Sequence, residues 1–106
     1  MAYKQLQNKI QTIVNQIVKK YHPEKIILFG SLVAGKTHKW SDADLVVVKS
    51  TNKKFSDRIG EVSSIVDHDL PIDFLVYTPN EFAKMSSSNY FMRDEILKKG
   101  KVLYEQ

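Results

Sequence analysis

Hydrophobic residues follow two different spacings along the chain, which predict helices and strands in alternation. Between residues 6 and 18 they recur every three or four positions, the period of an amphipathic helix, and Pro23 limits that helix. Short continuous apolar runs, typical of buried strands, follow at residues 26–29, 45–48 and 72–77. Because each run is apolar on both faces, both sides of the resulting sheet should be covered.

The connections between these runs predict how the strands pair. Apolar positions between residues 55 and 66 indicate a helix, and the unit from the second strand to the third has the ~30-residue length of a βαβ crossover. Thr78 and Glu81 form a capping box with Pro79 at the first helical position.

The rest of the chain predicts a polar loop, a helix and a short strand. Residues 86–89 are expected to form the loop. A helix over about 90–99 ends at Gly100, and residues 102–104 add an edge strand. The predicted class is α/β: one small mixed sheet flanked by helices, in a single domain over residues 1–106.

Composition narrows the class of protein. The 106 residues are 42% hydrophobic and 26% charged, as in an ordinary globular domain. There is no cysteine, and the sequence has no signal-peptide pattern or membrane-length apolar run, so we expect a cytoplasmic protein. The net charge of +4 comes from scattered lysines, which indicate a solvated surface rather than direct nucleic-acid binding.

Residues that could act in catalysis or ligand binding lie at the ends of the predicted strands. Gly30 and Ser31 leave the first strand, Asp42 and Asp44 enter the second, and Asp73 lies early in the third. Asp42 and Asp44 can project to the same side, since successive strand residues alternate. If strand one runs antiparallel to strand two, and strands two and three are parallel, all these residues converge at one edge.

Three carboxylates beside a glycine turn suit a site for Mg²⁺ and a nucleoside triphosphate. Mg²⁺ is usually held by one or two carboxylates and substrate phosphates, and two such ions can assist an in-line displacement. The simpler alternative makes Asp42 a turn residue and Asp73 a cap. It leaves Asp44 unexplained, because a carboxylate without a partner is costly beside a buried strand.

These residues resemble a known signature. Gly30-Ser31, ten intervening residues and then Asp42-Ala43-Asp44 are similar to the motif of the DNA polymerase β-like nucleotidyltransferase superfamily, particularly its minimal nucleotidyltransferase (MNT) branch. Pro71-Ile72-Asp73-Phe74 resembles the strand that carries the third carboxylate in that superfamily. Residues 100–105 resemble the sequence with which its domains usually end.

The resemblance implies a role for each residue. Gly30 and Ser31 would hold the triphosphate of ATP, while Asp42, Asp44 and Asp73 would bind two Mg²⁺ ions, Asp73 also helping to deprotonate the acceptor. The family often has a basic residue directly after Gly-Ser, whereas this chain has Leu32, and Ala34 where another basic residue is frequent. Lys36 or Lys39 could then take the phosphate-binding role.

The resemblance also implies a partner. The chain ends soon after the third carboxylate, so we expect the acceptor site in trans, on a separately encoded all-helical HEPN-type protein in a hetero-oligomer. In such pairs the MNT protein acts as the antitoxin, in some by adenylylating its partner. The alternative function is a non-catalytic antitoxin that only masks the partner.

Residues 30–37 also match the P-loop pattern G-x-x-x-x-G-K-[ST]. Only seven residues separate Thr37 from Leu45, which leaves little room for the helix that a P-loop opens. No apolar strand of the chain ends in the aspartate that P-loop proteins use to hold Mg²⁺. The sequence therefore favours the nucleotidyltransferase interpretation.

Overall fold

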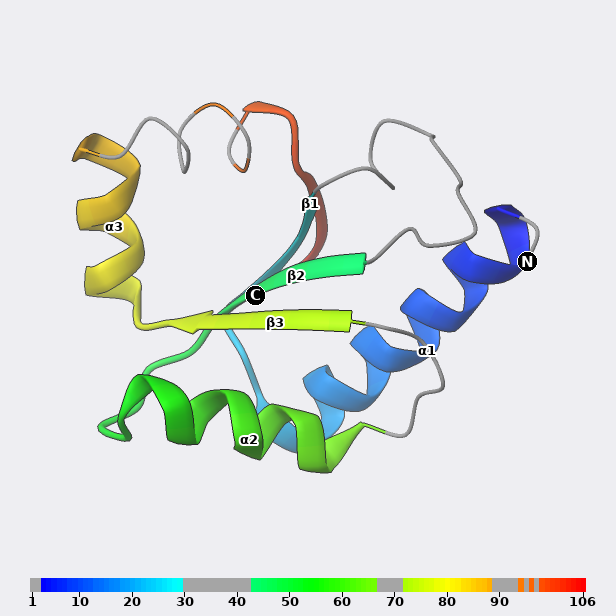
Figure 1. Cartoon of the computed structure of the whole chain (residues 1–106), viewed down its shortest axis with the longest axis horizontal. Coiled ribbons are helices and arrows are strands. Elements are labelled where there is room, and N and C mark those ends of the chain that lie inside the picture. Colours follow the sequence, from blue (N-terminus) through cyan, green and yellow to red (C-terminus); the bar gives the residue numbers. More distant parts are fainter. Residues whose placement is uncertain (1–2, 30–42, 67–71, 89–93, 95, 97) are drawn as a thin grey trace.

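A four-stranded sheet with helices on both faces forms the molecule (Figure 1). The computed structural model describes residues 3–29, 43–66, 72–88, 94, 96 and 98–106. Its elements in chain order are α1 (Tyr3–Tyr21), β1 (Lys25–Phe29), β2 (Ala43–Val48), α2 (Phe55–Ile65), β3 (Ile72–Tyr77), α3 (Pro79–Ser88) and β4 (Lys101–Glu105).

The strand order is β3-β2-β1-β4, and the sheet is mixed. β1 runs antiparallel to both of its neighbours, β2 and β4. β2 and β3 are parallel, as a helical crossover through α2 requires. This topology confirms the predicted mixed sheet, including the antiparallel first pair on which the predicted convergence of the site depended.

α1 is held by its apolar stripe, which lies in the core rather than on the surface. Ile10, Ile13, Val14 and Ile17 are each at most 3% exposed. The helical spacing of apolar residues between positions 6 and 18 predicted this helix, and the structure confirms it. The helix ends at Tyr21, and the next residue, His22, has a φ of 55°, in the left-handed region common just after a helix. No helix in the described part of the chain is long and apolar enough to cross a bilayer.

Two clusters of buried side chains cover the two faces of the sheet. The first joins α1 and α2 to one face, through residues such as Leu45, Phe74 and Val62. The second contains Val46, Val48 and Ile96, with Phe82 and Met85 of α3 packed against it. Figure 1 shows α1 and α2 on one side of the sheet and α3 on the other. Both faces are covered, as predicted.

α3 begins with the predicted capping box. The Thr78 N–H donates to Glu81 Oε1 at 2.8 Å, and the Glu81 N–H donates to Thr78 Oγ1 at 3.2 Å. The helix then continues through residues 86–88, so the loop predicted there is wrong for these three serines. Their hydroxyls donate to carbonyls one turn back, for example Ser86 Oγ to Phe82 O at 2.7 Å. Such bonds satisfy the polar side chains within the helix.

The segment before β4 ends at Gly100, as predicted. Asp94, Ile96 and Lys98 lie in helical turns, and the Gly100 N–H donates to Ile96 O at 3.0 Å. β4 is an edge strand, longer by one residue at each end than predicted. The register between β1 and β4 shifts after Ile26, which marks a bulge. Leu103 and Tyr104 both pack on the first cluster as a result.

Candidate active site

Asp44 and Asp73 occupy matching positions on adjacent parallel strands. The register of β2 and β3 pairs Asp44 with Asp73, Leu45 with Phe74 and so on along both strands. Neighbouring strands lie about 4.8 Å apart, and side chains at paired positions project to the same face. The two carboxylates predicted to share a site are therefore brought together by the sheet itself.

The face on which they lie follows from their neighbours. Leu45 and Phe74, one position further along each strand, belong to the cluster beneath α1 and α2. Because side chains alternate along a strand, Asp44 and Asp73 lie on the opposite face, the one that α3 flanks. The carboxylates thus stand on the side of the sheet that lacks the two longer helices.

Phe29 flanks Asp44 on the other side. It is the last residue of β1, it pairs with Asp44 in the antiparallel register, and it is 8% exposed. Gly30 and Ser31 follow Phe29 directly in the sequence. β1 therefore ends beside Asp44, just before these two residues. Four of the predicted site residues lie outside the described residues: Gly30, Ser31, Lys36 and Asp42. Lys39, the alternative phosphate-binding residue, lies outside them as well.

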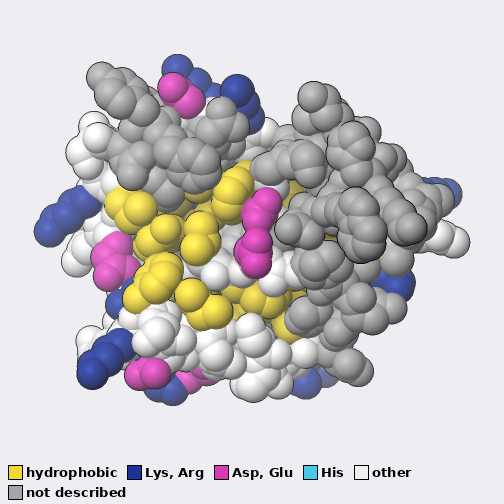
Figure 2. Space-filling model, viewed as in Figure 1, with side chains coloured by type: hydrophobic (Ala, Val, Ile, Leu, Met, Phe, Trp, Pro, Cys, Tyr) yellow, Lys and Arg dark blue, Asp and Glu magenta, His cyan; other side chains and the backbone are white. Residues whose placement is uncertain are grey.

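A ligand can reach the side chains of both Asp44 and Asp73. Asp73 is exposed on β3, an edge strand in the described sheet, and Asp44 is half-buried between Phe29 and Asp73. Figure 2 shows acidic side chains at the surface over the starts of β2 and β3, with hydrophobic side chains extending from there toward α3. This face of the sheet is therefore acidic at one end and apolar beyond it.

The donor set fits a divalent cation that prefers oxygen. Two carboxylates held on adjacent strands repel each other when both are ionised, and a cation between them removes that cost. Mg²⁺ takes one or two protein carboxylates and completes its shell with water and substrate phosphates. Asp44 and Asp73 supply such a pair, and Asp42 lies two residues before Asp44 in the sequence.

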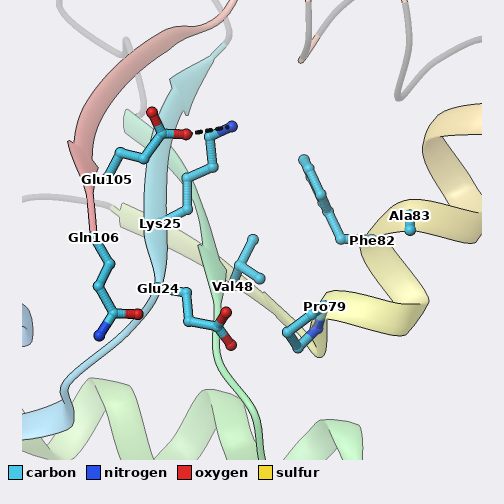
Figure 3. Close-up of a pocket in the computed structure, with 8 residues that line it drawn as sticks. All are labelled: Glu24, Lys25, Val48, Pro79, Phe82, Ala83, Glu105 and Gln106. Atoms are coloured by element: carbon cyan, nitrogen blue, oxygen red, sulfur yellow. Dashed lines mark ion pairs between the residues drawn. The ribbon is translucent and has the colours of Figure 1, made fainter.

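A groove that the sequence did not indicate lies at the opposite end of β2, where Val48 forms part of its lining (Figure 3). It has a volume of about 320 Å³. Pro79, Phe82 and Ala83 line it from α3, and Lys25 and Glu105 line it from β1 and β4. These residues come from four separate elements and form no motif, so only the tertiary structure could reveal the groove.

Comparisons with known proteins agree with this fold. A family model described as "Polymerase beta, Nucleotidyltransferase" matches residues 8–106. A protein from Sulfolobus solfataricus described as a "putative nucleotidyltransferase" has a similar fold, with a TM-score of 0.70 and 18% sequence identity. That match covers 98% of this chain and 84% of the other. No match was found among curated proteins.

The family match extends over residues 30–37, which also satisfy the P-loop pattern. It favours the nucleotidyltransferase interpretation of that stretch. The family, the mixed sheet and the Asp44–Asp73 pair lead to one assignment. This chain belongs to the polymerase β nucleotidyltransferase family.

Proposed function

We propose that the protein is a Mg²⁺-dependent nucleotidyltransferase that moves AMP from ATP onto an acceptor hydroxyl. The observation that carries the proposal is the pairing of Asp44 with Asp73 in the β2–β3 register. It puts two carboxylates on the α3 side of the sheet, at the end where β1 finishes with Phe29, the residue before Gly30 and Ser31 in the sequence.

Each residue has a distinct role in this proposal. Asp44, with Asp42, would hold the cation that accompanies the triphosphate, and Asp73 would complete the metal site. Gly30 lets the backbone approach the phosphates, while Ser31 and Lys36 contact their oxygens. Bound Mg²⁺ would supply charge neutralisation for the attacking and leaving oxygens.

The reaction is an in-line displacement at the α-phosphorus. The acceptor oxygen forms a bond to that phosphorus, the bond to the oxygen bridging the α- and β-phosphates breaks, and pyrophosphate leaves. Asp73 takes the proton of the acceptor hydroxyl as general base. Its exposed position on an edge strand supports this role, because an acceptor can reach it from outside the sheet.

For the acceptor, we propose an all-helical HEPN-type protein, following the resemblance of the sequence to the MNT branch. The chain would then act as the antitoxin of the pair, by modifying its partner. The alternative, a subunit that neutralises its partner by masking alone, predicts the same complex but no covalent product. The two functions therefore differ in chemistry and can be separated by a variant that binds but does not react.

Calorimetry of Mg²⁺–ATP binding tests the paired carboxylates. Asp44→Asn removes one negative charge from the pair with little change in shape, so metal-dependent ATP affinity should fall by about tenfold or more. Asp57→Asn is a matched control, because Asp57 is exposed on α2, outside the Asp44–Asp73 pair. The assignment is wrong if Asp44→Asn binds Mg²⁺–ATP as tightly as the wild type and Asp57→Asn do.

A further inference from the structure

Of the three helices α1, α2 and α3 in the described part of the chain, α3 buries the least of its side-chain surface against the sheet. None of its ten residues, all of which the structure describes, is buried. α1 and α2 differ, since Ile17 and Val62 are both 0% exposed. Only half-buried side chains, including Phe82 and Met85, pack α3 against the second cluster. An element with few buried apolar contacts opens locally at a lower free-energy cost than the rest of the fold.

Strong polar contacts hold α3 at its first turn. Arg58 of α2 donates from Nη1 to Glu81 Oε1 at 2.7 Å and from Nη2 to Glu81 Oε2 at 3.4 Å. The same Glu81 Oε1 also accepts the Thr78 N–H. These contacts lie at the start of the helix, so they fix its N-terminal end to α2.

Arg58 is itself fixed by the rest of the structure. Its side chain is 8% exposed, its Nε donates to Lys53 O at 2.8 Å, and its Nη1 donates to Val76 O at 3.2 Å. The guanidinium is therefore anchored on α2 and β3, whereas Glu81 is 44% exposed and is carried by α3. A buried arginine with two backbone partners is a rigid point to which a movable helix can attach.

α3 also forms one side of the groove. Pro79, Phe82 and Ala83 are its contributions, and every other residue lining the groove comes from the sheet or from residues next to its strands. Figure 3 shows the Phe82 ring and Lys25 on opposite sides, with Val48 between them and the Lys25–Glu105 ion pair beyond. A displacement of α3 would therefore change the width of the groove without breaking the sheet.

We infer that α3 is a hinged wall of this groove, which swings about the Thr78–Glu81 turn and is held closed by the Arg58–Glu81 ion pair. Opening moves Phe82 away from the sheet and exposes Val48, which is 5% exposed in the closed form. Loss of the ion pair shifts the equilibrium toward the open form and leaves α1 and α2 in place.

Hydrogen exchange measured by mass spectrometry tests the hinge. Glu81→Gln removes the charge but keeps an oxygen that can accept the Thr78 N–H, so the cap survives. Amides of residues 82–88 should exchange faster than those of α1 and α2 in the wild type, and about three to ten times faster again in Glu81→Gln. Glu61→Gln is the control, because it breaks a different ion pair, between Glu61 of α2 and Lys53, which precedes that helix.

Thiol labelling gives a second readout at the groove itself. The chain has no cysteine, so Val48→Cys introduces a single thiol in the groove lining, and Val62→Cys introduces one in the cluster on the other face. Adding Glu81→Gln should accelerate labelling of the thiol at position 48 about three to ten times and leave labelling at position 62 unchanged.

Three outcomes would overturn the inference. The first is exchange of α3 as slow as that of α2. The second is Glu81→Gln accelerating α1, α2 and α3 equally, which indicates global destabilisation. The third is Glu81→Gln changing neither α3 exchange nor labelling at position 48. Faster exchange confined to α3, with faster labelling at position 48, supports it.

Discussion

Asp44 on β2 lies beside Asp73 on β3, although 28 other residues separate them in the chain. Their juxtaposition depends on the crossover through α2, which makes the two strands parallel and fixes their register. A slip of one residue would turn one carboxylate into the core beneath α1 and α2. The buried positions of Leu45 and Phe74, next to the two aspartates, oppose that slip.

Asp73→Asn should separate ATP binding from chemistry. Asparagine has nearly the shape of aspartate but cannot take a proton, so transfer should fall by about 10²-fold or more while much of the ATP affinity remains. Single-turnover rates and calorimetric affinities on the same preparation measure the two effects. An Asp73→Asn variant that transfers at the wild-type rate would exclude this carboxylate as the base.

The sequence predicted the sheet, and with it the placement of Asp44 beside Asp73, because strong local signals determine the strands. The apolar run at 72–77 has no competing helical period, and Thr78 with Glu81 is a specific capping pattern. Ser86–Ser88 were mispredicted because serine favours loops on average, whereas here each hydroxyl bonds to a carbonyl within the helix.

Other features depend on contacts between distant segments, which no local pattern encodes. Arg58 and Glu81 lie 23 positions apart, and each has an ordinary helical context in the sequence. The bulge that turns Leu103 and Tyr104 to one face arises from the pairing of β4 with β1, and the pattern of residues 102–104 does not reveal it. The groove beside Val48 has the same origin.

Gly100→Ala should destabilise the fold. A Cβ at this position would meet the carbonyl oxygen of Ile96 and would lie 2.8 Å from Cγ2 of Ile27, a fully buried side chain. Backbone and core must both shift, which costs about 1–3 kcal/mol. Gly60→Ala is the control, because its added Cβ meets nothing within 4 Å. Equal midpoints of chemical unfolding for the two variants would contradict this packing.

Tyr21→Phe should leave the protein as stable as the wild type or make it slightly more stable. Tyr21 is 5% exposed, and its hydroxyl lies near the Glu61 carboxylate but meets the geometry of a hydrogen bond with none of the described residues. Burial, with the nearby Glu61 carboxylate, raises the pKa of Tyr21 to about 12, so the hydroxyl stays protonated. Removing it relieves a desolvation cost of about 1 kcal/mol. A loss of more than about 1 kcal/mol on chemical unfolding would show that the hydroxyl is satisfied.

The Arg58–Glu81 ion pair should make the free energy of unfolding depend on pH. The hydrogen bonds from Arg58, and then from Thr78, lower the pKa of Glu81 below its usual 4.5. A carboxyl whose pKa is lower in the folded state stabilises it above the unfolded pKa, and this contribution is lost as the pH falls through the folded pKa. Because Glu81 is half-exposed, the effect is about 1 kcal/mol at pH 7.

Thermal unfolding of the wild type and Glu81→Gln across pH measures this contribution. The wild type should be the more stable of the two at pH 7, and the difference should shrink as the pH falls below about 4.5. A difference that stays constant from pH 7 to pH 3 would mean that the charge of Glu81 contributes nothing to stability.

Transfer of labelled phosphate tests the central claim most directly. The protein is incubated with Mg²⁺, an all-helical protein encoded beside it and ATP labelled at either the α- or the γ-phosphate. Nucleotidyl transfer predicts that the α label becomes attached to the helical protein with release of pyrophosphate, and that Asp73→Asn loses this product. Attachment of the γ label, or a tight complex with no label attached from either position, would contradict it.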